Sequence, residues 1–121
     1  LNDEDGVTFP EPMGNYNIDE YSVEVDVTNN TTEDATLIGW IDFDNDGLFE
    51  ANEAVSQTIA AGSGQQFVTL EWTELSGVAR GFTYGRFRVS TDSAFDTIND
   101  STSYGIVQDG EVEDYFVCIA D

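Results

Sequence analysis

The 121-residue chain has 25 Asp and Glu residues against three Lys and Arg, a formal net charge of −22 at pH 7, and no His. Nucleic acid and anionic membranes are excluded as partners, because both would be repelled by this charge. The absence of His removes the commonest general base and the commonest transition-metal ligand. With 40% hydrophobic and 12% aromatic residues, the chain is predicted to fold as one domain over residues 1–121.

Repulsion among the acidic side chains at a net charge of −22 destabilises a compact fold unless counter-ions bind. Bound calcium would offset it, and adaptation to a saline medium is a second, compatible explanation. The sequence begins at Leu1 and shows neither a signal peptide nor a transmembrane run, so we expect a domain cut from a larger protein. The single cysteine, Cys118, lies in an apolar run and is expected to be a buried, inert thiol.

Short segments of alternating apolar and polar residues predict strands along most of the chain. An acidic stretch at 1–9 is followed by a segment to residue 19 that two prolines interrupt. The clearest strand is 21–28, where every second residue is Tyr or Val. Further strands are predicted at 35–41, 54–61, within 65–75, and at 82–90 and 110–119. Trp40 and Trp72 lie in these strands and are predicted to be core residues.

About seven or eight strands with polar turns and no convincing helix predict an all-β fold. The expected architecture is an antiparallel β-sandwich stabilised by calcium. Its strand order stays open between a jelly roll and an immunoglobulin-like arrangement.

Residues 42–53 read Asp-Phe-Asp-Asn-Asp-Gly-Leu-Phe-Glu-Ala-Asn-Glu, with the spacing of a calcium loop. Carboxylates at alternate positions converge in a tight turn, and Gly47 permits the sharp bend. The predicted ligands are the side chains of Asp42, Asp44, Asp46, Glu50 and Glu53 and the carbonyl of Leu48. Hard oxygen ligands in this number suit Ca²⁺ better than Zn²⁺ or Cu²⁺. The alternative is an acidic surface turn without an ion.

Strands, rather than the helices of a calcium sensor, are predicted on both sides of this loop. There is no helix pair that could open on binding, so we expect a structural site rather than a switch.

A second acidic group lies at the two ends of the chain. It comprises Asp3, Glu4, Asp5, Glu111, Glu113 and Asp114. Since domain termini often lie close together, a second calcium site joining the ends is one interpretation. Successive strand residues point to opposite faces, however, so these acids cannot all bind one ion. The alternative pairs some of them with Arg80, Arg86 or Arg88, and Arg86 and Arg88 share a face and suit bidentate carboxylate pairs.

The closing pentapeptide Gly110-Glu111-Val112-Glu113-Asp114 resembles the motif that gives the GEVED domain family its name. The acidic residues 3–7, the stretch 40–47 and the basic strand at 86–90 extend the resemblance along the chain. It implies a β-sandwich module of large exported bacterial proteins, often adhesins and sometimes secreted enzymes with separate catalytic domains. It implies no catalytic activity for the module itself.

The sequence itself also predicts a module that is not an enzyme, because it has no nucleophile elbow, no phosphate-binding loop and no catalytic pair that includes His. Two function classes remain. In the first, the module is a calcium-stabilised structural or adhesive unit, extracellular or on a bacterial surface, monomeric, with neighbouring domains of the same chain as partners. In the second, it binds a glycan or peptide through the loop at 91–108, which is otherwise a flexible insertion. Tyr16, Tyr84, Phe95 and Tyr104 are the candidate stacking residues.

Overall fold

The computed structural model describes residues 2–8, 20–75, 81–92, 98 and 111–120, with the backbone alone for 2–5, 81, 111 and 118–120. Seven strands and one turn of 3₁₀-helix make up this part of the chain. They are β1 (Asn2–Thr8), β2 (Tyr21–Asn29), β3 (Ala35–Ile41), η1 (Ala51–Glu53), β4 (Ala54–Ile59), β5 (Gly64–Trp72), β6 (Gly81–Ser90) and β7 (Glu111–Ala120). Among the described residues, no helix has the length and apolar character needed to cross a membrane.

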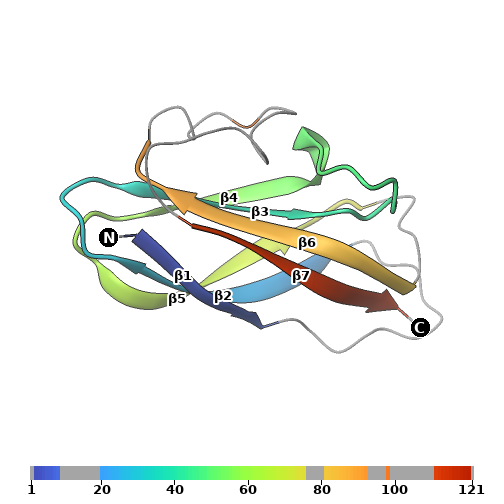
Figure 1. Cartoon of the computed structure of the whole chain (residues 1–121), viewed down its shortest axis with the longest axis horizontal. Helices are drawn as coiled ribbons and strands as arrows, with labels where there is room; N and C mark the ends of the chain where they lie inside the picture. The colour runs from blue at the N-terminus through green and yellow to red at the C-terminus, as the bar shows by residue number, and fades with distance from the viewer. Residues whose placement is uncertain (1, 9–19, 76–80, 93–97, 99–110, 121) are drawn as a thin grey trace.

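Two antiparallel sheets pack face to face (Figure 1). One has the strand order β1-β2-β5 and the other β4-β3-β6-β7. The predicted all-β sandwich is therefore confirmed. The first, second and fifth strands share a sheet, as in immunoglobulin-like sandwiches, and the fourth lies beside the third in the opposite sheet. Of the two orders that the sequence left open, the described strands follow the immunoglobulin-like one.

Strand positions agree closely with the alternation in the sequence. In β2, Tyr21, Val23, Val25 and Val27 are all buried, while most residues between them face solvent. Their side chains meet those of Leu70 and Trp72 on β5 and of residues from β3, β6 and β7, which together form the sandwich core. This core is the main source of stability, because apolar burial dominates folding.

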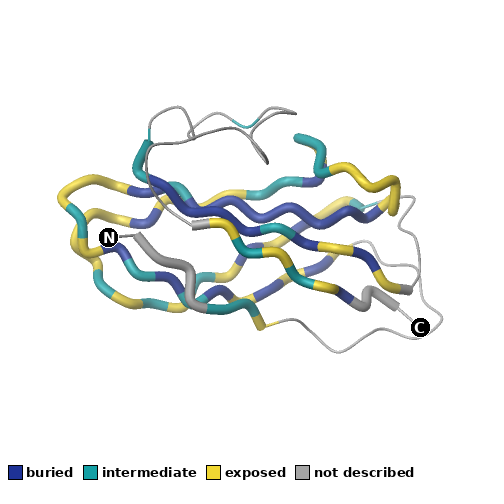
Figure 2. The backbone as a smooth tube through the Cα atoms, viewed as in Figure 1, coloured by how far each residue is buried: buried dark blue, intermediate teal, exposed yellow. Residues whose placement is uncertain are grey.

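The strand β3 is buried on both faces, as Figure 2 shows along its length. Leu37 and Ile41 face the sandwich core. Ile38 and Trp40 point to the outer face, where Phe49, Ala54 and Ile98 pack against them. Both predicted core tryptophans are thus buried, but Trp40 belongs to this outer cluster and Trp72 to the sandwich core.

Gly39 of β3 has no room for a side chain on the face that packs into the core. A Cβ at this position would lie 2.8 Å from Leu70 Cδ1 and 2.8 Å from Phe87 Cε1. Because Phe87 is fully buried, its ring has no free space into which to move. Glycine therefore lets β5 and β6 side chains fill the space over β3.

Candidate metal centre

The loop predicted from the sequence runs from Asp42, directly after β3, to Glu53, the last residue of η1. It turns sharply in two places, where Asn45 and Gly47 have φ angles of 55° and 85°. Gly47 adopts this left-handed conformation without steric cost, as its predicted role in the bend requires. The loop then returns through the η1 turn into β4, so strands flank it on both sides.

Asp42 holds the first half of the loop together. It is buried, its main-chain N–H donates to the carbonyl of Tyr84 at 3.1 Å, and its own carbonyl accepts from Thr83 Oγ1 at 2.7 Å. The side chain accepts from the main chain of the loop, Oδ1 from the Asp46 N–H at 3.2 Å and Oδ2 from the Gly47 N–H at 2.8 Å. These bonds fix the carboxylate while leaving lone pairs on both oxygens.

Glu53 closes the loop from the other side, and the residue is only 5% exposed. Oε1 accepts a hydrogen bond of 3.1 Å from the Glu50 N–H, and the main-chain carbonyl accepts one of 2.8 Å from Trp72 Nε1. Oε2 is buried and has no hydrogen-bond donor among the described residues. A buried oxygen without a donor is costly, so this atom lacks the partner that a folded protein normally supplies.

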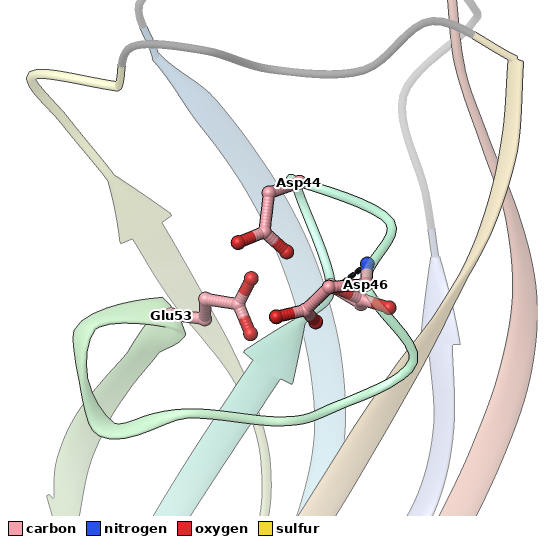
Figure 3. Close-up of side chains that lie close together, drawn as sticks. Asp44, Asp46 and Glu53 are labelled. Carbon is pink, nitrogen blue, oxygen red and sulfur yellow. Dashed lines mark hydrogen bonds between the residues drawn. The ribbon is translucent and has the colours of Figure 1, made fainter.

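Four carboxylates converge on one point in the loop. Each of Asp42, Asp44, Asp46 and Glu53 places an oxygen within 4.8 Å of the oxygens of the other three. In Figure 3 the carboxylate of Glu53 points from η1 toward those of Asp44 and Asp46. The unpartnered oxygen of Glu53 is thus part of the side chain that faces the cluster.

The local electrostatics reflect this crowding. Burial, together with the charges of Asp44 and Asp42 and a side-chain hydrogen bond with Asp44, raises the pKa of Glu53 to about 8, against the lowering effect of the hydrogen bond from the Glu50 N–H. Burial also raises the pKa of Asp42. The pKa of Asp46 is lowered, chiefly by the hydrogen bond of 2.9 Å from the Leu48 N–H. A protonated Glu53 is the response of a buried acid among like charges, and a bound cation would reverse it.

This donor set fits a hard divalent cation. All four groups offer carboxylate oxygens, two of them from buried residues and two from exposed ones. A cation among them would supply the missing partner of Glu53 Oε2 and neutralise part of the repulsion. The arrangement could therefore hold a metal ion in the loop.

Of the other two predicted ligands, Glu50 lies outside the converging group and the carbonyl of Leu48 stays a prediction. The N–H of Glu50 nevertheless orders Glu53. Leu48 donates its N–H to Asp46 and leaves its side chain exposed. The sequence carried no signal for Thr83 and Trp72, because both reach the loop from strands far along the chain.

The second acidic group is arranged differently. The strands β1 and β7 pass close to each other but belong to different sheets. Glu113 accepts a hydrogen bond of 2.7 Å from the Tyr115 hydroxyl, and Asp114 forms an ion pair with Arg86. The predicted alternative of carboxylate–arginine pairing is thus confirmed for Asp114. The side chains of Asp3, Asp5 and Glu111 lie outside the described residues, as does Arg80.

Most of the predicted ligand-binding loop lies outside the described residues, including Phe95 and Tyr104, and so does Tyr16. Of 91–108, the structure describes Thr91, Asp92 and Ile98. Tyr84 is described and is 56% exposed. The side chain of Cys118 is not among those described.

Comparison with known proteins identifies one family. The model of the GEVED domain matches residues 36–118. The match includes both the acidic loop and the closing motif. No curated protein and no solved structure matches the chain significantly.

Proposed function

This chain belongs to the GEVED domain family, and we propose that it is a calcium-binding, non-catalytic module of a larger secreted or cell-surface bacterial protein, an adhesin. Its role in that protein would be structural support or adhesion. One observation carries the calcium assignment: Glu53, whose buried Oε2 has no hydrogen-bond donor in the part of the chain that the structure describes, is one of the four converging carboxylates. The family suggests an accessory module of a larger protein.

Calcium is favoured over other cations by the chemistry of the ligands. Carboxylate and carbonyl oxygens suit hard cations, and the spacing matches the positions 1, 3, 5, 7, 9 and 12 of a twelve-residue calcium loop. Magnesium requires a tighter, near-octahedral shell and retains its waters, so it should bind more weakly. Extracellular modules often bind calcium with millimolar dissociation constants, which suits a secreted protein.

A structural role follows from the anchoring of the loop. Asp42 is bonded to β6 within its own sheet, through Thr83 and Tyr84, and Glu53 is bonded to Trp72 of β5 in the opposite sheet. An ion bound between Asp42 and Glu53 would join these two attachments. Its binding energy would then stabilise the sandwich, because the ligands converge only in the folded state.

We restrict the calcium assignment to this loop. A second site at Asp3, Asp5, Glu111, Glu113 and Asp114 would have to compete with the ion pair between Asp114 and Arg86. Glu113 and Asp114 also point to opposite faces of β7, so one ion cannot contact both.

Isothermal titration calorimetry of the chelator-treated protein tests the assignment. We expect one calcium ion per chain and clearly weaker binding of magnesium. Asp44→Asn should reduce calcium binding, because Asp44 is an exposed ligand whose loss disturbs little else. Glu24→Gln, an exposed position on β2 in the other sheet, removes the same charge outside the loop and serves as the matched control. Equal binding by Asp44→Asn and the wild type would contradict the assignment.

Exposed aromatic side chains on the outer face of β6 and β7 favour a second candidate function, the binding of a neutral glycan. Phe82, Tyr84 and Phe116 are 59%, 56% and 61% exposed and contact one another, with ring centroids 4.9 Å apart for Phe82 and Phe116 and 5.3 Å for Tyr84 and Phe116. Aromatic rings on a protein surface contact the apolar faces of ligands, and an uncharged sugar is not repelled by a net charge of −22.

A glycan array in the presence of calcium tests this candidate. Saturable binding that Tyr84→Ala and Phe116→Ala abolish would support it. Phe67→Ala, an exposed aromatic change on β5 in the other sheet, is the control. If no glycan on the array binds, this candidate is wrong and the structural role remains as the proposed function.

A further inference from the structure

Arg86 connects the closing motif of the chain to the acidic loop. On one side, its Nε donates to Asp114 Oδ1 at 2.7 Å and its Nη2 to Asp114 Oδ2 at 2.8 Å. On the other side, its Cζ lies 5.2 Å from the ring centroid of Phe49, within the range of a cation–π contact. A bidentate pair fixes the plane of the guanidinium group, so its position over the ring is set by Asp114.

Phe49 belongs to the loop and lies four residues before Glu53. Its side chain packs against Ile38 and Trp40 in the outer cluster of β3. Arg86 lies opposite Trp40 in the register between β3 and β6, and opposite Asp114 in the register between β6 and β7. Three neighbouring strands thus align Asp114, Arg86 and Trp40 in one row, and Phe49 lies over this row.

We propose that Asp114 and Arg86 are positioning residues for the metal site, which hold Phe49 against β3 and so place the half of the loop that ends in Glu53. This inference rests on the proposed calcium binding and adds a role for Asp114, the last residue of the closing motif. Asp114 would influence the site through Arg86, and neither residue would contact the ion.

The geometry separates this role from direct ligation. Both carboxylate oxygens of Asp114 accept hydrogen bonds from Arg86, and none of the four converging carboxylates belongs to β7. The second half of the loop contributes one converging carboxylate, that of Glu53. The segment before Glu53 contacts the sheet through the side chain of Phe49, so the position of Phe49 influences where Glu53 lies. Mutating a direct hydrogen-bond partner of a metal ligand commonly lowers affinity by about 10- to 100-fold, and a residue that acts through intervening contacts is expected at the lower end of this range.

The test is a double-mutant cycle on the calcium dissociation constant, measured by titration calorimetry for the wild type, Asp114→Asn, Phe49→Leu and the double variant. We expect Asp114→Asn to weaken calcium binding about tenfold with an unchanged ion count. In the Phe49→Leu background, the same change should have little further effect, because the contact through which it acts is gone. If Asp114 only stabilised the fold, Asp114→Asn would lower the free energy of unfolding in chelator by similar amounts in both backgrounds. Its effect on calcium affinity would then not depend on Phe49.

Arg86→Lys tests the geometry, since lysine keeps the positive charge but cannot form the bidentate pair with Asp114. This variant should weaken calcium binding in the same way as Asp114→Asn. Glu24→Gln controls for the loss of one negative charge. Provided that the wild type binds calcium, three results would overturn the inference. They are an unchanged calcium affinity in Asp114→Asn, a lower number of bound ions in that variant, or an equal loss of affinity in both backgrounds. A wild type that binds no calcium would overturn the proposed function and this inference together.

Discussion

The indole Nε1–H of Trp72 donates a hydrogen bond of 2.8 Å to the main-chain carbonyl of Glu53, across the two sheets of the sandwich. Trp72 ends β5 and packs against Tyr21 and Phe43, with ring centroids 6.3 Å and 6.0 Å away. Phe43 follows Asp42 directly in the loop. The aromatic group of Tyr21, Phe43 and Trp72 therefore forms the base on which both ends of the acidic loop lie.

Replacing Trp72 with Phe tests this attachment. The change leaves the buried carbonyl of Glu53 without its donor, which should cost about 1–3 kcal/mol in the free energy of unfolding. Calcium affinity should fall as well, because the end of the loop that carries Glu53 is released. Urea unfolding with and without calcium measures both effects. Phe67→Leu, an exposed change on the same strand, should stay within about 0.5 kcal/mol, and an equal loss there would contradict the explanation.

Gly39→Ala tests the close contact between the sheets. The new Cβ would approach Leu70 and the buried ring of Phe87 to 2.8 Å, so the core must shift. Overpacking of this kind typically costs about 1–3 kcal/mol. Urea unfolding should show this loss, while calcium binding should be retained in the folded protein, since Gly39 lies in β3 before the loop. A variant as stable as the wild type would show that the packing over Gly39 is looser than described.

The pH dependence of stability reports on Glu53 in the calcium-free protein. Its folded-state pKa of about 8 lies above the ordinary value of 4.5, so between these values the folded chain holds a proton that the unfolded chain has lost. The resulting stabilisation is fully present below the lower value and is lost as the pH rises through about 8. In chelator, the melting temperature should therefore fall from about pH 6 to about pH 9.

Calcium should abolish this fall, because a bound cation keeps Glu53 ionised in the folded state. Glu53→Gln cannot lose the proton and should show a much smaller fall in chelator. If this variant and the wild type lose stability equally over the range, another group is responsible.

Much of the fold could be predicted from local patterns. The alternation from Tyr21 to Val27 locates a strand with one buried face, and the boundaries of β3 agree with the predicted 35–41. The spacing from Asp42 to Glu53 correctly anticipates that carboxylates converge, because the loop is local and its geometry depends on few residues. These features are set by contacts between residues that are near in sequence.

Contacts across the sandwich could not be predicted in the same way. The bond from Trp72 to Glu53 and the row of Asp114, Arg86 and Trp40 depend on which strands are neighbours and in what register. An alternating pattern shows that a strand has a buried face, but it does not show which strand lies opposite. For the same reason, the sequence leaves open whether Asp114 joins the acids at the other end of the chain or pairs with an arginine, and the register between β6 and β7 places it opposite Arg86.

Thermal unfolding in chelator and in excess calcium, with the wild type and Asp44→Asn side by side, tests the central claim most directly. A cation that binds only the folded state raises the melting temperature by mass action. We predict a clear rise with calcium for the wild type, a much smaller rise for Asp44→Asn, and a weaker effect of magnesium on both. Coincident wild-type curves with and without calcium would contradict the account.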